Sequence, residues 1–126
     1  MKFKIVMKKE NESIFPWPSR FRGVVLYPRV IMRPKTYDTG VIAQAELFNR
    51  RALVRLFRHE LEHVYQIERM GVLRFYASYL WIILRTGYKN HPLEEEANDV
   101  EETPLTQREL KWLREGVIDL SDPEEE

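Results

Sequence analysis

The sequence predicts an α+β fold in which short strands come first and helices follow. Residues Gly23 to Met32 (GVVLYPRVIM) are rich in the residue types that favour strands. Residues Arg51 to Met70 contain neither glycine nor proline and repeat their apolar side chains at helical spacing. With 126 residues, of which 44% are hydrophobic, the whole chain is expected to form one domain around a single core.

The N-terminal part carries few signals of regular structure. We expect residues 1–20 to be loosely ordered, because Pro16 and Pro18 keep their segment extended and disfavour a helix. Pro28 is expected either to divide residues 23–32 into two short strands or to mark an edge strand.

Two segments link these strands to the first long helix. Residues 33–40 contain Pro34, Asp38 and Gly40, which predict a turn. Residues Val41 to Phe48 (VIAQAELF) fit both strand alternation and helical spacing, and we assign them as a strand.

Four helices are predicted downstream, over residues 51–70, 72–86, 92–102 and 106–114. Gly71 is a natural stop between the first two, and Pro92 suits the first turn of the third. Thr106 and Glu109 have the spacing of a capping box at the start of the fourth. The acidic tail, residues 121–126, is expected to be disordered.

Composition argues against several classes of partner and site. The formal net charge is zero and no basic face stands out, so no nucleic-acid partner is expected. Cysteine is absent, which excludes disulfides and thiolate zinc ligands. The apolar part of the N-terminus is too short for a secretory signal, and a cytoplasmic location is expected.

The most apolar run, Ala77 to Leu84, lies between Arg74 and Arg85 and is too short to cross a bilayer. We expect a buried helix there. The alternative is an interfacial helix, with aromatic residues at the lipid boundary: Tyr76, Tyr79 and Trp81.

The most informative motif is His59-Glu60-Leu61-Glu62-His63, which matches H-E-x-x-H. On a helix, residues four apart lie one above the other, so His59 and His63 can reach one zinc ion. Glu60, about 100° around the helix from His59, can meet a water molecule on the open side of the metal. The same turn would also suit a solvent-facing helix with an ion pair between Arg58 and Glu62.

A catalytic zinc site generally needs a third protein ligand. The acidic run that follows Pro92 supplies the candidates Glu94, Glu95 and Glu96 at the positive end of a helix. His91 is a candidate fourth ligand, a transition-state stabiliser or a surface cap.

Two tyrosines are candidate proton donors to an oxyanion, Tyr65 and Tyr88. Each also suits the role of a buried aromatic side chain whose hydroxyl reaches water.

These motifs resemble the gluzincin group of zinc peptidases, in particular the minigluzincins and a small uncharacterised family with the pattern H-E-L-x-H-V-x-Q. That pattern is present from His59 to Gln66, and the resemblance covers residues 41–100. Glu94 to Asn98 is similar to the second gluzincin motif, E-x-x-[A/S]-D. The resemblance implies that Glu94 is the third ligand and that Asn98 replaces the usual aspartate around the metal. Ala97 would be the small residue that lets the two helices approach.

The resemblance implies a zinc-dependent peptidase that acts on a peptide or protein substrate. In this hypothesis Glu60 accepts a proton from the zinc-activated water, and an edge strand, with Val41 to Phe48 as the candidate, holds the substrate. By analogy with latent minigluzincins, the segment from Thr103 onwards would cover the site. The alternative function is an inactive zincin-like domain that binds metal for structure or regulation, with its fourth position closed by His91.

Overall fold

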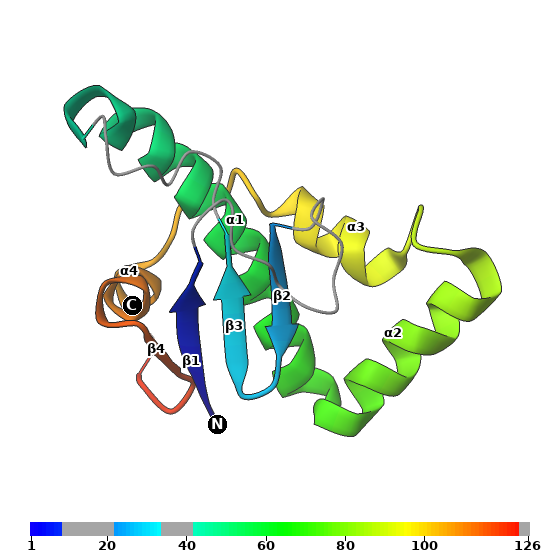
Figure 1. The fold of residues 1–126 in the computed structure, drawn as a ribbon. Coiled ribbons are helices and arrows are strands. Elements are labelled where there is room, and N and C mark those ends of the chain that lie inside the picture. Colours follow the sequence, from blue (N-terminus) through cyan, green and yellow to red (C-terminus); the bar gives the residue numbers. More distant parts are fainter. Residues whose placement is uncertain (9–21, 34–41, 124–126) are drawn as a thin grey trace.

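The computed structural model describes residues 1–8, 22–33 and 42–123, and for residues 42–50 it describes the backbone only. It confirms the α+β class: within these residues, a four-stranded mixed sheet is combined with four helices (Figure 1). The elements are β1 (Lys2–Met7), β2 (Gly23–Leu26), β3 (Arg29–Met32), α1 (Ile42–Met70), α2 (Val72–Thr86), α3 (Pro92–Asp99), α4 (Gln107–Glu115) and β4 (Val117–Asp119).

The strands are ordered β2-β3-β1-β4. β2 and β3 form the antiparallel pair predicted on the two sides of Pro28. β1 runs parallel to β3 and antiparallel to β4. Among the described strands, β2 therefore lies at an edge of the sheet.

The expectation that residues 1–20 are loosely ordered was wrong for residues 2–7, which form β1 near the centre of the sheet. The segment KFKIVM alternates polar and apolar residues, as a strand with one buried face does. Phe3 and Ile5 point into the core, and this burial outweighs the flanking lysines. Residues 9–20 of that prediction, and residues 34–40 of the predicted turn, lie outside the described residues.

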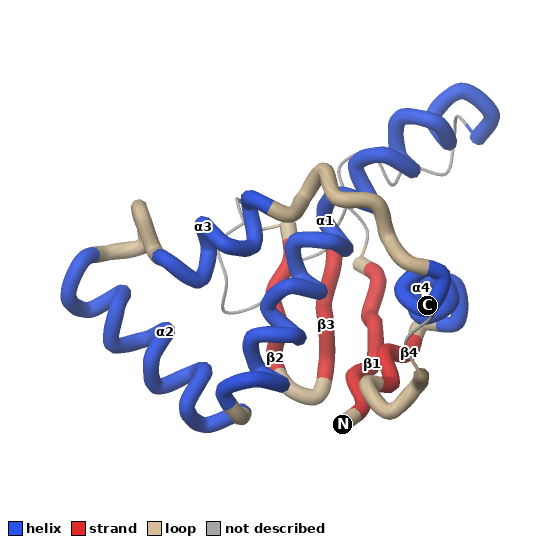
Figure 2. The backbone as a smooth tube through the Cα atoms, turned by 180° about the vertical axis from the view of Figure 1, so that it is seen from behind, coloured by secondary structure: helices blue, strands red, loops and turns tan. Residues whose placement is uncertain are grey.

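Helix α1 crosses one face of the sheet, as Figures 1 and 2 show from opposite sides. Its apolar side packs on the strands and contributes four buried residues to the core: Phe57, Leu61, Val64 and Ile67. The assignment of residues 41–48 as a strand was wrong for residues 42–48, because the helix already begins at Ile42, and residue 41 lies outside the described residues. No glycine or proline interrupts the chain between that residue and Met70, and helix propagates readily from a formed turn.

Helix α2 has the predicted bounds and begins after Gly71, whose φ of 86° lies in the region that favours glycine. Only one side of it is covered, with Phe75 buried. The expectation that residues 77–84 are buried was therefore wrong for several of them: Leu80, Trp81 and Leu84 are each more than half exposed. Among the described residues, no helix is both long and apolar enough to cross a membrane.

The C-terminal elements close the other edge of the sheet. The predicted capping box is confirmed, since Thr106 and Glu109 each accept the other's backbone N–H at the start of α4. The chain then turns at Gly116 into β4. Disorder was a wrong expectation for residues 121–123, because Asp122 accepts a 2.9 Å hydrogen bond from Nε1 of buried Trp112.

Helix α3 is shorter than predicted and ends at Asp99 rather than near residue 102. Pro104 disfavours helical conformation in the residue before it, and tight turns replace the last helical turn. This early end proves important, because it places Glu101 in the site.

Candidate metal centre

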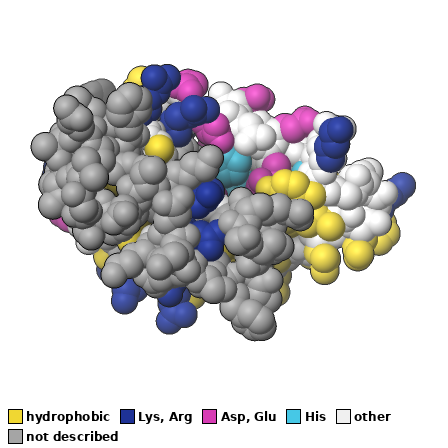
Figure 3. All heavy atoms as spheres, turned by 45° about the horizontal axis from the view of Figure 1, so that its top comes forward, with side chains coloured by type: hydrophobic (Ala, Val, Ile, Leu, Met, Phe, Trp, Pro, Cys, Tyr) yellow, Lys and Arg dark blue, Asp and Glu magenta, His cyan; other side chains and the backbone are white. Residues whose placement is uncertain are grey.

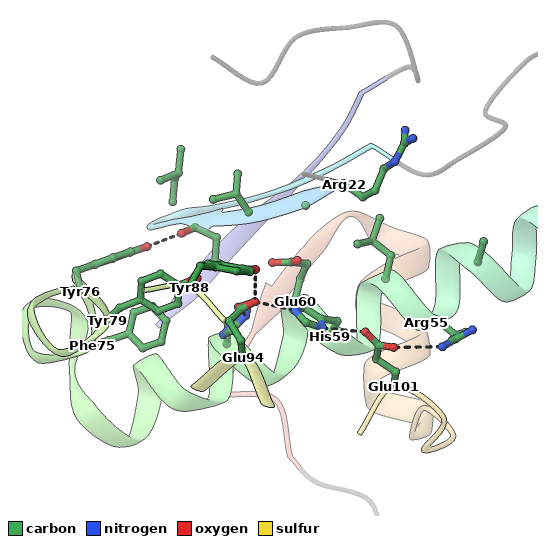
Figure 4. Close-up of a pocket in the computed structure, with 17 residues that line it drawn as sticks. Arg22, Arg55, His59, Glu60, Phe75, Tyr76, Tyr79, Tyr88, Glu94 and Glu101 are labelled. Atoms are coloured by element: carbon green, nitrogen blue, oxygen red, sulfur yellow. Dashed lines mark hydrogen bonds and ion pairs between the residues drawn. The ribbon is translucent and has the colours of Figure 1, made fainter. Parts of the chain in front are cut away.

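His59, Glu60 and His63 lie on the side of α1 that faces the β2 edge of the sheet (Figure 4). The apolar side of α1 is anchored in the core, and this anchoring fixes the rotation of the helix. His59 and His63 consequently stand side by side, with ring centroids 5.1 Å apart. Both are largely shielded from solvent, as metal-ligating histidines usually are.

Helix α3 brings Glu94 to the same point. Pro92 occupies its first turn and His91 caps it, so Glu94 lies in the first turn and is buried against α1. Ala97, one turn later, is fully buried, so its small side chain suits the close packing of α3 against α1.

The three side chains converge through the atoms that a metal would use. Nε2 of His63 lies 2.5 Å from Oε1 of Glu94, and Nε2 of His59 lies 3.5 Å from Oε2. The ligand atoms of all three lie within 4.8 Å of one another. Two imidazoles and one carboxylate form the donor set of many catalytic zinc sites.

The other ring nitrogen of each histidine has its own partner. Nδ1 of His59 lies 2.9 Å from Oε1 of Glu101, and Nδ1 of His63 lies 2.9 Å from Oε1 of Gln66. Each partner oxygen can accept a hydrogen bond from Nδ1–H, which leaves Nε2 as the atom that would bind a metal ion, as the outer partners of metal-binding histidines do.

Asn98 is not one of these partners. Its side chain is exposed, and its backbone oxygen accepts from Glu101 N in the turn after α3. That turn carries Glu101 back to His59, where a carboxylate replaces the expected amide. Glu101, three residues later, thus holds the place beside His59 that was expected for Asn98.

Glu60 is buried next to the cluster, at 4% exposure. Burial raises the pKa of its carboxyl group, although the neighbouring charges of His63 and His59 oppose this. Gly23 of β2 packs directly against it: a Cβ atom added to this glycine would stand 2.7 Å from Oε1 of Glu60.

A cavity of about 610 Å³ opens in front of these residues. The backbone of β2 forms one wall, α1 forms the floor, and aromatic residues close one end: Phe75, Tyr76, Tyr79 and Tyr88. Arg22 and Arg55 lie at the other end together with Glu101, so the cluster sits between an aromatic region and a region of mixed charge (Figure 4). Figure 3 shows histidine next to acidic side chains at the surface of this region.

The three candidate ligands stabilise one another's charged forms. Burial alone would lower the pKa of His59, but the hydrogen bond to Glu94 and the charge of Glu60 raise it to about 9. The pKa of His63 is raised for the same reasons. Burial alone would raise the pKa of Glu94, but its hydrogen bonds to both histidines lower it well below its ordinary value. The carboxylate is thus ionised, as a metal ligand must be.

The two candidate tyrosines have different surroundings. The Tyr88 hydroxyl donates to Oε2 of Glu94 at 2.6 Å, inside the cavity. Burial and Glu94 raise its pKa, so it remains a proton donor at neutral pH. The Tyr65 hydroxyl instead donates to Glu109 of α4 at 2.6 Å and does not line the cavity.

His91 is a buried helix cap rather than a surface cap. Its Nδ1 accepts from Leu93 N, and its Nε2 lies 3.1 Å from the carbonyl oxygen of Tyr79. Both ring nitrogens are therefore engaged away from the candidate ligands.

The other two glutamates of the acidic run after Pro92 do not contact the histidines. Glu95 is exposed, and Glu96 pairs with Arg69 at 2.6 Å. Arg58 contacts Glu109 at 3.4 Å rather than forming the surface pair considered for Glu62. Of the three glutamates, Glu94 is the one that joins the histidines.

Sequence reasoning missed the roles of Gly23, Gln66 and Glu101. Gln66 was visible as part of the H-E-L-x-H-V-x-Q pattern, three residues after His63 and so on the same side of the helix. Glu101 had no comparable signal, because it lies beyond the end of α3. Gly23 is identified only by its contact with Glu60.

Comparison with known proteins identifies no relative: no family model, curated protein or solved structure matches the chain.

Proposed function

We propose that this protein is a zinc-dependent peptidase. The observation that carries the proposal is the convergence of His59, His63 and Glu94 beside buried Glu60 in an open cavity. The donor set, the engaged Nδ1 atoms and the ionised carboxylate all suit zinc. A zinc ion held by these three residues would supply Lewis acidity and activate a water molecule for attack on a carbonyl carbon.

Glu60 is the proposed general base. It accepts a proton from the attacking water and then delivers that proton to the leaving amine nitrogen, so that one proton is moved and none is consumed. Its raised pKa brings it closer to neutrality, where a carboxyl group can both accept and donate.

Tyr88 is the proposed stabiliser of the developing oxyanion. Its hydroxyl is at the edge of the cluster and remains protonated, so it can turn from Glu94 towards the substrate oxygen.

The edge strand β2 replaces residues 41–48 as the proposed support for an extended substrate. The bond from Arg33 N to Arg22 O shows which backbone groups of β2 face β3. By alternation, the backbone groups of Gly23 and Val25 face the open edge. The Tyr76 hydroxyl donates to Val25 O and accepts from Tyr27 N. Among the described residues, this leaves Gly23 as the point of β2 where a substrate backbone can pair.

The first test combines metal content with hydrolysis of a generic protein substrate such as casein. We expect about one zinc per chain in the wild type, and its loss in His63→Ala and Glu94→Gln. Glu60→Gln should retain zinc and lose at least about 100-fold in hydrolysis, because the proton acceptor is removed.

Matched controls are available on the same helices. Glu95→Gln changes the exposed neighbour of Glu94, and Glu68→Gln changes an exposed glutamate of α1. Both should retain zinc and activity. Zinc binding without hydrolysis in the wild type would favour the inactive metal-binding domain, and failure to bind zinc at all would refute both functions.

A further inference from the structure

Helix α2 presents a continuous apolar stripe to solvent. The exposed fractions are 87% for Leu73, 57% for Leu80, 59% for Trp81 and 73% for Leu84, and Ala77 between them is also exposed. These positions recur every three to four residues and therefore lie along one side of the helix. Large apolar side chains that are contiguous and exposed usually mark an interaction surface.

The opposite side of α2 is the one that packs on the protein. Phe75 is buried there, and Tyr76 and Tyr79 line the cavity beside the candidate ligands. Figures 1 and 2 show α2 at the outer side of the molecule, beyond β2. The stripe therefore faces away from the fold and is separate from the candidate metal centre.

The charged residues of α2 and of the turn that follows it are all basic. Arg74 and Arg85 lie three helical turns apart and so share one flank of the helix. The Arg85 guanidinium lies 5.6 Å from the ring centroid of exposed Trp81. Lys89 follows shortly after the helix, and residues 72–91 contain no aspartate or glutamate, although the net charge of the chain is zero.

We propose that α2 docks lengthwise on a bilayer surface that contains anionic lipids. The stripe would enter the headgroup region, with Trp81 at the boundary and the basic flank over the lipid phosphates. A second copy of the chain fits less well, because antiparallel pairing of two α2 helices would bring Arg74 of one next to Arg85 of the other. One side of α2 would face the lipid and the opposite side lines the cavity, so docking would place the cavity close to the membrane.

The test is flotation of the intact, zinc-supplemented protein with vesicles. Vesicles of phosphatidylcholine with about one third phosphatidylglycerol should carry the wild type upward, and pure phosphatidylcholine vesicles should carry much less. Leu80→Gln/Leu84→Gln should lower the partition coefficient at least about tenfold, because it removes two inserted side chains. Arg74→Gln/Arg85→Gln should lower it about 10- to 30-fold at low salt, and less at high salt.

Control variants make changes of the same kind outside α2. Leu110→Gln alters an exposed leucine of α4, and Lys4→Gln/Arg114→Gln removes two exposed basic residues. Each should float like the wild type. All variants alter exposed side chains, and circular dichroism verifies that each is folded.

Three results would overturn the proposal. The wild type could remain unbound with anionic vesicles, or the α2 variants could bind as well as the controls. A lipid-free dimer that dissociates in Leu80→Gln/Leu84→Gln would instead assign the stripe to a second copy of the chain.

Discussion

At the scale of single residues, the missing side chain of Gly23 is as informative as any side chain that is present. The Glu60 carboxylate occupies the space where a Cβ atom of this β2 residue would lie. Glu60 cannot retreat into the core, because it is already buried between α1 and the sheet. The position of the proposed base thus depends on two elements that are far apart in sequence.

Gly23→Ala is therefore expected to displace Glu60 without removing any metal ligand. Misplacement of a catalytic group by about 1 Å costs about 100-fold in rate, so kcat/KM should fall by roughly that factor while zinc content is unchanged. Parallel hydrolysis and metal assays measure this. Ile31→Ala, on the neighbouring strand β3 and outside the cavity lining, is the control. An active Gly23→Ala protein would show that the contact is irrelevant.

Tyr88 and Tyr65 differ in what their hydroxyl groups contact. Tyr88→Phe should lower kcat about 10- to 100-fold with little change in KM, because it removes the proposed oxyanion donor. Tyr65→Phe should leave kcat unchanged and lower the free energy of unfolding by about 1–3 kcal/mol, because buried Glu109 loses a hydrogen bond. Steady-state kinetics and denaturant unfolding separate the two effects. Equal kcat values for both variants would remove Tyr88 from the mechanism.

At the scale of secondary structure, prediction succeeded where the local pattern was sufficient. The bounds of α2 follow from Gly71 and Gly87, and the capping box of α4 follows from Thr106 and Glu109. The helix over residues 51–70 follows from its apolar repeat and its lack of glycine and proline, and on that helix the four-residue spacing puts His59 and His63 on one side.

Prediction failed where distant partners decide the outcome. β1 becomes a strand because β3 and β4 pair with both of its edges. Residues 42–48 join α1, although their alternation also suited a strand. The bond from Glu101 to His59 depends on where α3 ends, and helix ends are poorly determined by local sequence.

The turn after α3 leads to a prediction about metal affinity. Glu101 accepts from His59 and also contacts Arg55 at 3.3 Å, which orients its carboxylate. Glu101→Gln keeps the shape but removes the charge, and should weaken zinc binding about 10- to 100-fold. Competition with a chromophoric chelator measures the affinity.

The adjacent residue supplies the control for that experiment. Glu102 pairs with Arg55 through its own carboxylate at 3.0 Å but does not contact a histidine. Glu102→Gln and Asn98→Ala should therefore bind zinc like the wild type. If Asn98→Ala weakens zinc binding and Glu101→Gln does not, Asn98 is the residue that supports the metal site, as the motif alone suggests.

At the scale of the whole molecule, the candidate metal centre and the C-terminal segment lie at opposite edges of the sheet (Figure 1). The cavity opens beside β2, and none of the residues that line it comes from α4 or β4. Residues 103–123, the described part of the segment from Thr103 onwards, therefore do not cover the site, contrary to the expectation from latent minigluzincins. They complete the core instead, through fully buried Trp112 and Ile118.

Removal of residues 104–126 should consequently unfold the protein rather than activate it. Loss of a large core side chain typically costs about 3–5 kcal/mol, and a domain of this size has only about 5–15 kcal/mol of stability. Loss of Trp112, Ile118 and β4 together would remove most of the free energy of unfolding. A thermal melt by circular dichroism should show a cooperative transition for a chain shortened only by residues 124–126, and none for the longer truncation. A folded, faster enzyme after the longer truncation would instead show that this segment inhibits hydrolysis.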